Sequence, residues 1–166
     1  MTLLAPIIIG IVMLIVDQLT KYGILQLFEG RIEDIPLING VLSLYHVNND
    51  GAGFSIFSGQ TTFLIILTTA FIIFITYLLL ARKFESKLTD YAFCLVLSGG
   101  IGNLIDRIFR NGQVVDFIKT DFIDFPIFNV ADICITIGAG LLILYFILDM
   151  IKEMKEKKEQ NINGKS

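Results

Sequence analysis

Four apolar runs, each about 20 residues long, are the feature that most limits how this chain can fold. They cover residues 3–28, 63–81, 88–109 and 128–151, with few charges inside them. A helix needs about 20 predominantly apolar residues to cross the hydrocarbon layer of a membrane. We therefore predict an all-α membrane protein with four transmembrane helices. The four spans form a single domain over residues 1–151, and residues 152–166 form a flexible tail.

Composition and charge argue against a nucleic-acid-binding protein. Of the 166 residues, 54% are hydrophobic, the mean hydropathy is +0.73 and the net charge is −3, so the chain offers no basic footprint for nucleic acid. Cys94 and Cys134 each lie inside an apolar run and are expected to be small buried side chains. His46 has no cysteine or acidic partner at ligand spacing, so we expect neither a metal nor a cofactor.

Lysine and arginine residues are unevenly shared between the predicted loops. Cytoplasmic loops of membrane proteins are enriched in these residues, and eight of the 13 lie in the link between the second and third runs or in the tail. They are Arg82, Lys83, Lys87, Lys152, Lys155, Lys157, Lys158 and Lys165. We therefore predict that both termini and the tail are cytoplasmic, and that residues 29–62 and 110–127 face outward.

The first outward loop is too long for a simple turn. Its segment "GVLSLYHV" (40–47) is rich in strand-forming residues, "NNDG" (48–51) supplies turn residues, and "AGFSIF" (52–57) resumes the apolar pattern. This order predicts a small extracytoplasmic strand–turn–strand element between the first and second helices.

Polar residues from three helices and one loop fall at a single predicted depth, near the outer surface. Asp17 and Lys21 share a helix face at i, i+4, and an ion pair between them is expected. In the third helix, Arg107 is expected to pair with Asp106 as structural support. The whole set comprises Asp17, Lys21, Asn103, Asp106, Arg107, Asp116, Asn129 and Asp132.

A purely structural role does not explain Asp116 and Asp132. Polar side chains do hold membrane helices together, and such contacts explain the ion pairs of this set, but intramembrane acids are costly and are functional candidates. Two carboxyl groups that share one proton can hydrolyse a peptide bond, as in an aspartic dyad. A small proton-coupled carrier and a non-catalytic assembly factor remain alternatives.

Five short motifs resemble the signature blocks of bacterial lipoprotein signal peptidase, also called signal peptidase II. They are "DQLTK" (17–21), "NDGAGFS" (49–55), "GGIGNLIDR" (99–107), "VVDF" (114–117) and "FNVAD" (128–132), and they occur in the order of that family. The resemblance implies an aspartic endopeptidase of the bacterial cell membrane. Its substrates would be prolipoproteins carrying diacylglycerol, cut before the lipid-modified cysteine. We expect a monomer in contact with membrane lipid.

The resemblance also implies roles for individual residues. Asp116 and Asp132 match the catalytic pair. Four residues match polar positions around the substrate cleft: Asn49, Asn103, Arg107 and Asn129. Asp17 and Lys21 match a block that supports the fold and the site. Asn48 and Gly53 depart from the usual pattern, which bears on loop packing and substrate contacts.

Two glycine-rich stretches, residues 99–102 and 138–140, admit two interpretations. Small residues allow helices to approach closely in membranes. The stretches could therefore receive a substrate helix or serve packing within the bundle.

Overall fold

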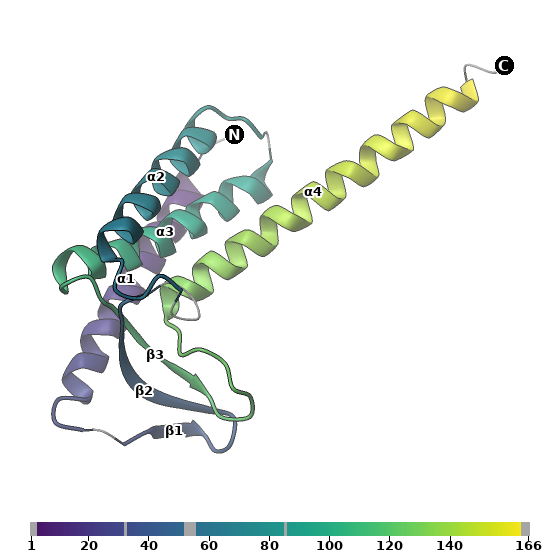
Figure 1. Cartoon of the computed structure of the whole chain (residues 1–166). Coiled ribbons are helices and arrows are strands. Elements are labelled where there is room, and N and C mark those ends of the chain that lie inside the picture. Colours follow the sequence, from purple (N-terminus) through teal and green to yellow (C-terminus); the bar gives the residue numbers. More distant parts are fainter. Residues whose placement is uncertain (1–2, 32, 52–55, 85, 164–166) are drawn as a thin grey trace.

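The computed structural model describes residues 3–31, 33–51, 56–84 and 86–163. Within these ranges four helices are long and apolar enough to cross a membrane. They are α1 (Leu4–Leu27), α2 (Thr61–Leu80), α3 (Lys87–Phe109) and α4 (Val130–Asn163). Figure 1 shows them as a bundle with a small sheet at one end, while α4 extends well beyond the other helices. The predicted fold class, four membrane-spanning helices with a small β element, is confirmed.

α3 is the central helix: it packs against α1, α2 and α4 and is the most buried of the four. Its glycines permit this close packing. A Cβ atom at Gly99 would lie 2.2 Å from the carbonyl oxygen of Ala131, and one at Gly102 would lie 2.6 Å from the Asp17 carboxylate. On α4, a Cβ atom at Gly138 would lie 2.8 Å from a carbonyl oxygen of α3. These three glycines therefore serve packing within the bundle.

The sheet has three antiparallel strands in the order β1 (Ile35–Ile38), β2 (Leu42–Asn49) and β3 (Val114–Thr120). The predicted strand in "GVLSLYHV" corresponds to β2, whose partners among the described residues are β1 and β3. β2 follows a turn at Asn39 and Gly40, whose φ of 72° favours glycine. Its second partner, β3, comes from the other loop, so local sequence pattern could not reveal it.

The motif "NNDG" lies at the end of β2 and does not close a hairpin with "AGFSIF" in the described residues. Residues 52–55, including the unusual Gly53, lie outside the described residues, and residues 56–59 form a turn. The sheet is attached to α1 by an apolar cluster in which Ile24 and Phe28 pack with Val115 and Phe117. This cluster holds β3 over the end of α1.

α4 differs from its predicted range of 128–151 at both ends. It begins at Val130, because Phe128 pairs with Ile118 of β3 instead of joining the helix. It continues to Asn163 because the sequence from 141 to 163 contains neither glycine nor proline and is rich in lysine and glutamate, which favour helix. Ion pairs at i, i+4 join Lys152 to Glu156 and Glu153 to Lys157. The flexibility of this tail stays a prediction.

Candidate active site

Asp116 and Asp132 reach the same cavity from different elements. Asp116 lies on β3 and Asp132 on the first turn of α4. The cavity has a volume of about 790 Å³, and Asn49, Asn103 and Arg107 line it as well. The structure therefore brings together polar residues that are up to 83 positions apart in the chain, from Asn49 to Asp132.

Asp132 belongs to the N-terminal cap of α4. The Asn129 side-chain oxygen accepts a hydrogen bond from the Asp132 backbone N–H at 3.0 Å. In return, the Asp132 carboxylate accepts one from the Asn129 backbone N–H at 3.1 Å. This reciprocal arrangement is a capping box, and it places an acid at the positive end of the helix dipole. It explains why a segment about to cross a membrane opens with an asparagine and an aspartate.

Asparagine amides donate to both acids. Asp116 accepts hydrogen bonds from the Nδ2 atoms of Asn129 at 2.6 Å and Asn49 at 2.8 Å. Asp132 accepts one from Nδ2 of Asn103 at 2.8 Å. Asn129 is fully buried and is not among the residues that line the cavity. Asn129 therefore holds the acids and does not line the cleft. The family resemblance had placed it among the residues around the cleft.

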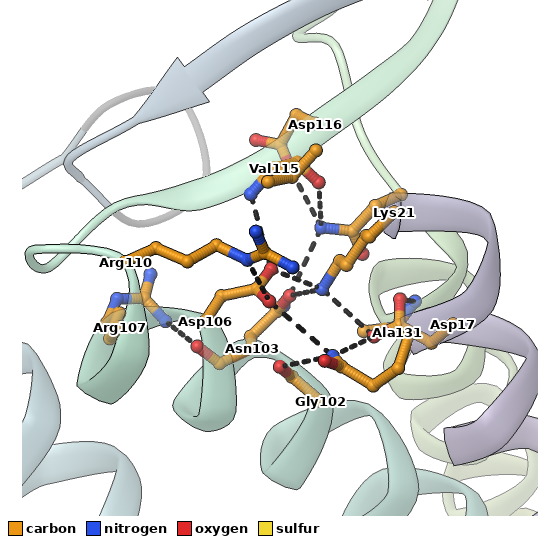
Figure 2. Close-up of polar contacts among 12 residues, drawn as sticks. Asp17, Lys21, Gly102, Asn103, Asp106, Arg107, Arg110, Val115, Asp116 and Ala131 are labelled. Carbon is orange, nitrogen blue, oxygen red and sulfur yellow. Dashed lines mark hydrogen bonds and ion pairs between the residues drawn. The ribbon is translucent and has the colours of Figure 1, made fainter. Parts of the chain in front are cut away.

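Lys21 lies beneath these amides and is fully buried. Its Nζ atom is 2.9 Å from each of three oxygens, one each on Asp17, Asp106 and Asn103 (Figure 2). The predicted ion pair between Asp17 and Lys21 is confirmed. An ammonium group has three N–H donors, and these three contacts use all of them.

Asp17 and Asp106 each bind the backbone next to one of the two acids. Asp17 accepts a hydrogen bond at 2.9 Å from the N–H of Ala131, which directly precedes Asp132. Asp106 accepts one at 3.2 Å from the N–H of Val115, which directly precedes Asp116. Because Lys21 pairs with both supporting acids, one cation connects the two segments that carry the cavity acids.

The expected pairing of Arg107 with Asp106 is wrong. Asp106 pairs with Lys21 and with Arg110, whose Nε lies 3.2 Å away at i, i+4. Adjacent residues on a helix do not face each other, whereas residues four apart do, and this spacing could have identified Arg110. Arg107 instead donates to the carbonyl oxygen of Gly51 at 2.7 Å and lines the cavity.

Gln18 also contacts the supporting residues of the site, and no sequence pattern identified it. Its Nε2 atom donates to Asp17 at 3.1 Å and to the carbonyl oxygen of Gly102 at 3.2 Å. It therefore ties the supporting acid of α1 to the central helix. Glutamine next to an acid gives no distinct sequence signal, so only the packing of α1 on α3 identifies it.

Other residues singled out in the sequence lie around the site or away from it. Asn48 lines the cavity, and the His46 ring lies within 3.3 Å of its side-chain oxygen. Cys94 and Cys134 are buried free cysteines, as predicted. Across the described ranges, no three His, Cys, Asp or Glu side chains are grouped so that they could hold a metal ion.

Burial makes ionisation of Asp116 unfavourable. It raises the pKa of the carboxyl group from 3.8 to about 6, against the opposing effect of the hydrogen bond from Asn49; the nearby Asp132 charge adds to the rise. The cluster contains four aspartates (17, 106, 116 and 132) and three cations (Lys21, Arg107 and Arg110). One proton held by the pair of cavity acids would balance these charges.

Comparison with known proteins finds similar sequences and structures over most of the chain. A family model described as "Signal peptidase (SPase) II" matches residues 9–148. A "Lipoprotein signal peptidase" from Shouchella clausii is 42% identical over 151 residues, covering 91% of this chain and 98% of the relative. Another from Halalkalibacterium halodurans is 42% identical over 156 residues, covering 93% and 97%. A solved "Bacterial membrane enzyme structure" is 35% identical, with a TM-score of 0.82 and coverage of 88% of this chain and 89% of that chain.

Proposed function

This chain belongs to the signal peptidase II family, and we propose that Asp116 and Asp132 are the two carboxyl groups with which it hydrolyses its substrate. By family it is a membrane-embedded lipoprotein signal peptidase, a peptidase of the aspartic type. The observation that carries the proposal is that both acids line one cavity while asparagine amides hold them from α3, β2 and the cap of α4.

In the proposed reaction the two acids share one proton. The ionised carboxylate takes a proton from water while the water oxygen attacks the peptide carbonyl carbon, and the protonated carboxyl gives its proton to the carbonyl oxygen. The tetrahedral intermediate then loses its C–N bond. Its hydroxyl returns a proton to one acid, and the other acid protonates the departing nitrogen. The pair is thereby restored to its starting state.

The raised pKa of Asp116 suits this cycle, because a carboxyl group with a pKa of about 6 holds its proton at a higher pH than an ordinary aspartate and can act as the acid. Arg107 lines the cavity from α3 and supplies a positive charge beside the pair. Fixed charges and donors placed before the reaction lower the energy of the charge that develops during it. We assign Arg107 to substrate contact, Asn103 and Asn129 to holding the acids, and Asn49, which lines the cavity and donates to Asp116, to both roles.

The walls of the cavity suggest how a membrane-bound substrate is received. Leu64 and Leu67 of α2 face the cavity, as do Ile133 and Ile137 of α4, so its walls there are apolar. We propose that this part receives the signal helix and acyl chains of a prolipoprotein that carries diacylglycerol. The polar end would then meet the peptide bond before the lipid-modified cysteine.

We further propose that the protein acts as a monomer in the bacterial cell membrane, in contact with lipid, with both termini cytoplasmic and the acids near the outer face. The basic residues of the α2–α3 link and the tail support this orientation. A peptidase that cuts a signal peptide at its outer end needs its acids at that level.

The test uses purified protein in vesicles with a diacylglyceryl-modified preprotein, and cleavage is followed by the appearance of the processed band. Asp116→Asn and Asp132→Asn should each abolish cleavage while keeping the thermal stability of a folded protein, since an amide cannot exchange protons as a carboxyl group does. Asp149→Asn, an exposed position on the same helix as Asp132, is the matched control and should cleave normally.

Near-normal cleavage by either variant at the cavity would contradict the assignment of the pair. It would then favour a structural role for these acids. A chelating agent should leave cleavage unchanged, because the proposed chemistry uses only the carboxyl groups and water.

A further inference from the structure

Five exposed apolar side chains gather at one end of the sheet. Each of them is between 43% and 63% exposed; they are Leu37, Ile38, Val41, Phe122 and Ile123. We call this group the sheet-tip patch. Contiguous exposed apolar surface of this kind marks a site of interaction with another surface.

The sheet-tip patch is built from two segments far apart in the chain. Leu37, Ile38 and Val41 belong to β1 and the β1–β2 turn, whereas Phe122 and Ile123 follow β3. A backbone hydrogen bond of 3.0 Å from the Asp121 N–H to the Val41 carbonyl oxygen joins the segments. The adjacent residues Leu42 and Thr120 are partners in the sheet. The two groups of apolar residues are therefore held together by backbone pairing.

The patch is separate from the cavity. None of its five members lines the cavity. In the segment that connects β3 to α4, the first residue that lines the cavity is Phe125. Its neighbours on the sheet are polar: Asp34 and Asp121 both pair with Lys119, and Ser43 donates to Asp121. The end of the sheet thus combines apolar side chains with a fixed cluster of charged ones.

The patch also lies close to the level at which the chain enters the membrane. Backbone hydrogen bonds join Ile118 and Phe128 in both directions, at 2.8 and 3.1 Å, so residues 119–127 fold back on themselves. The membrane-spanning helix α4 starts only two residues after Phe128. In Figure 1 the sheet extends obliquely across the ends of the helices, and its tip points away from α1. This direction places the tip to one side of the helix ends.

We propose that the sheet-tip patch inserts into the boundary between lipid headgroups and acyl chains, in the leaflet at which the sheet lies. Surfaces that combine large apolar side chains with charged neighbours are typical of this boundary, where aromatic residues are enriched. β3 runs directly from Asp116 to Thr120 at the tip. Lipid contact at the patch therefore holds Asp116 at a set height relative to the membrane. The inference does not depend on the catalytic assignment.

The absence of tryptophan from the sequence allows a direct test. Phe122→Trp and Leu37→Trp each place a single tryptophan in the patch, one on each contributing segment. Glu33→Trp, at an exposed position before β1, is the matched control. Each full-length variant is reconstituted in phosphatidylcholine–phosphatidylglycerol vesicles, with or without bromine atoms on the acyl chains. Unchanged helix content by circular dichroism establishes that a variant is folded.

Bromolipid should remove most of the fluorescence of Phe122→Trp and Leu37→Trp, and iodide in the buffer should have little effect on them. Glu33→Trp should show the reverse pattern. Patch variants that iodide quenches as strongly as Glu33→Trp would overturn the proposal, because the patch would then face water. Shielding from both quenchers would also overturn it, since the patch would then be covered by protein. Equal bromolipid quenching of the control would count against a contact specific to the patch.

Discussion

The Lys21 ammonium donates a hydrogen bond to the side-chain oxygen of Asn103, with the two atoms 2.9 Å apart. Since this contact occupies the amide oxygen, the amide nitrogen of Asn103 points in the opposite direction and donates to Asp132 at 2.8 Å. A buried cation on α1 therefore determines which atom of an α3 side chain meets an acid of α4. Lys21 does not line the cavity, and it acts on the site through Asn103.

Replacement of this cation should weaken the fold strongly. Lys21→Met leaves Asp17 and Asp106 buried without their shared partner, and breaking a buried ion pair in this way costs about 3 to 5 kcal/mol. Denaturation in detergent measures the change in the free energy of unfolding. In the double variant Lys21→Met/Asp106→Asn, one unpaired charge is removed, so its loss of stability should be smaller than the sum of the two single losses. Additive losses would contradict the shared role of Lys21.

Asn129 combines a cap and a donor, and one substitution separates these two roles. Asn129→Ser keeps a side-chain oxygen able to cap α4 but removes the Nδ2 atom that donates to Asp116. We expect stability within about 1 kcal/mol of the original, together with a severe loss of cleavage. The alkaline limb of the pH–rate profile should move to higher pH, because the carboxylate of Asp116 loses a donor that lowers its pKa. Asn129→Ala, which loses the cap as well, should be less stable than Asn129→Ser.

Stability should depend on pH through Asp116. Its pKa is about 6 in the folded protein against 3.8 ordinarily, so the folded state binds this proton more tightly than the unfolded chain does. The resulting stabilisation is complete below about pH 4 and is lost as the pH rises through about 6, with a total of about 3 kcal/mol. Asp116→Asn should lack this component. Unfolding measured between these pH values should show the two proteins diverging, and parallel curves would contradict the raised pKa.

The glycine contacts predict opposite effects for two substitutions in neighbouring helices. Gly99→Ala would place a Cβ atom 2.2 Å from the Ala131 carbonyl oxygen, which forces α4 away from α3 and should cost about 1 to 3 kcal/mol. It should also reduce cleavage, since Asp132 lies on that turn of α4. Gly140→Ala is the control: apart from its neighbours in the same helix, no described atom lies within 4 Å of the added carbon, so the higher helix propensity of alanine should leave stability unchanged or slightly raised. Thermal unfolding of both variants in detergent checks this difference.

Single-cysteine labelling in intact cells tests the proposed orientation. A reagent that cannot cross the membrane should label Glu33→Cys and Gln113→Cys from outside, and should label Lys83→Cys and Glu159→Cys only after the cells are opened. Background labelling should be low, because Cys94 and Cys134 are both buried. The reverse pattern would place the acids at the cytoplasmic face and contradict the orientation taken from the basic residues.

The sequence by itself determined the four spans, their approximate limits and the set of polar residues. Transfer of an apolar side chain into lipid depends on that residue and its near neighbours along the helix, so a run of about 20 residues carries the information for one span. The i, i+4 pairing of Asp17 with Lys21 is local for the same reason. The motif blocks also indicated the family, which the comparisons then established.

Only the tertiary structure decided how these residues are connected. β3 pairs with a strand about 70 residues away, and Asp106 pairs with Lys21 of another helix instead of with its neighbour Arg107. Asp17 and Asp106 bind the backbone just before Asp132 and Asp116, contacts that depend on how α1, α3, β3 and α4 meet. Strand pairing and buried hydrogen bonds are selected by the whole packed arrangement, because a buried polar group without a partner is costly, and its partner can lie anywhere in the chain.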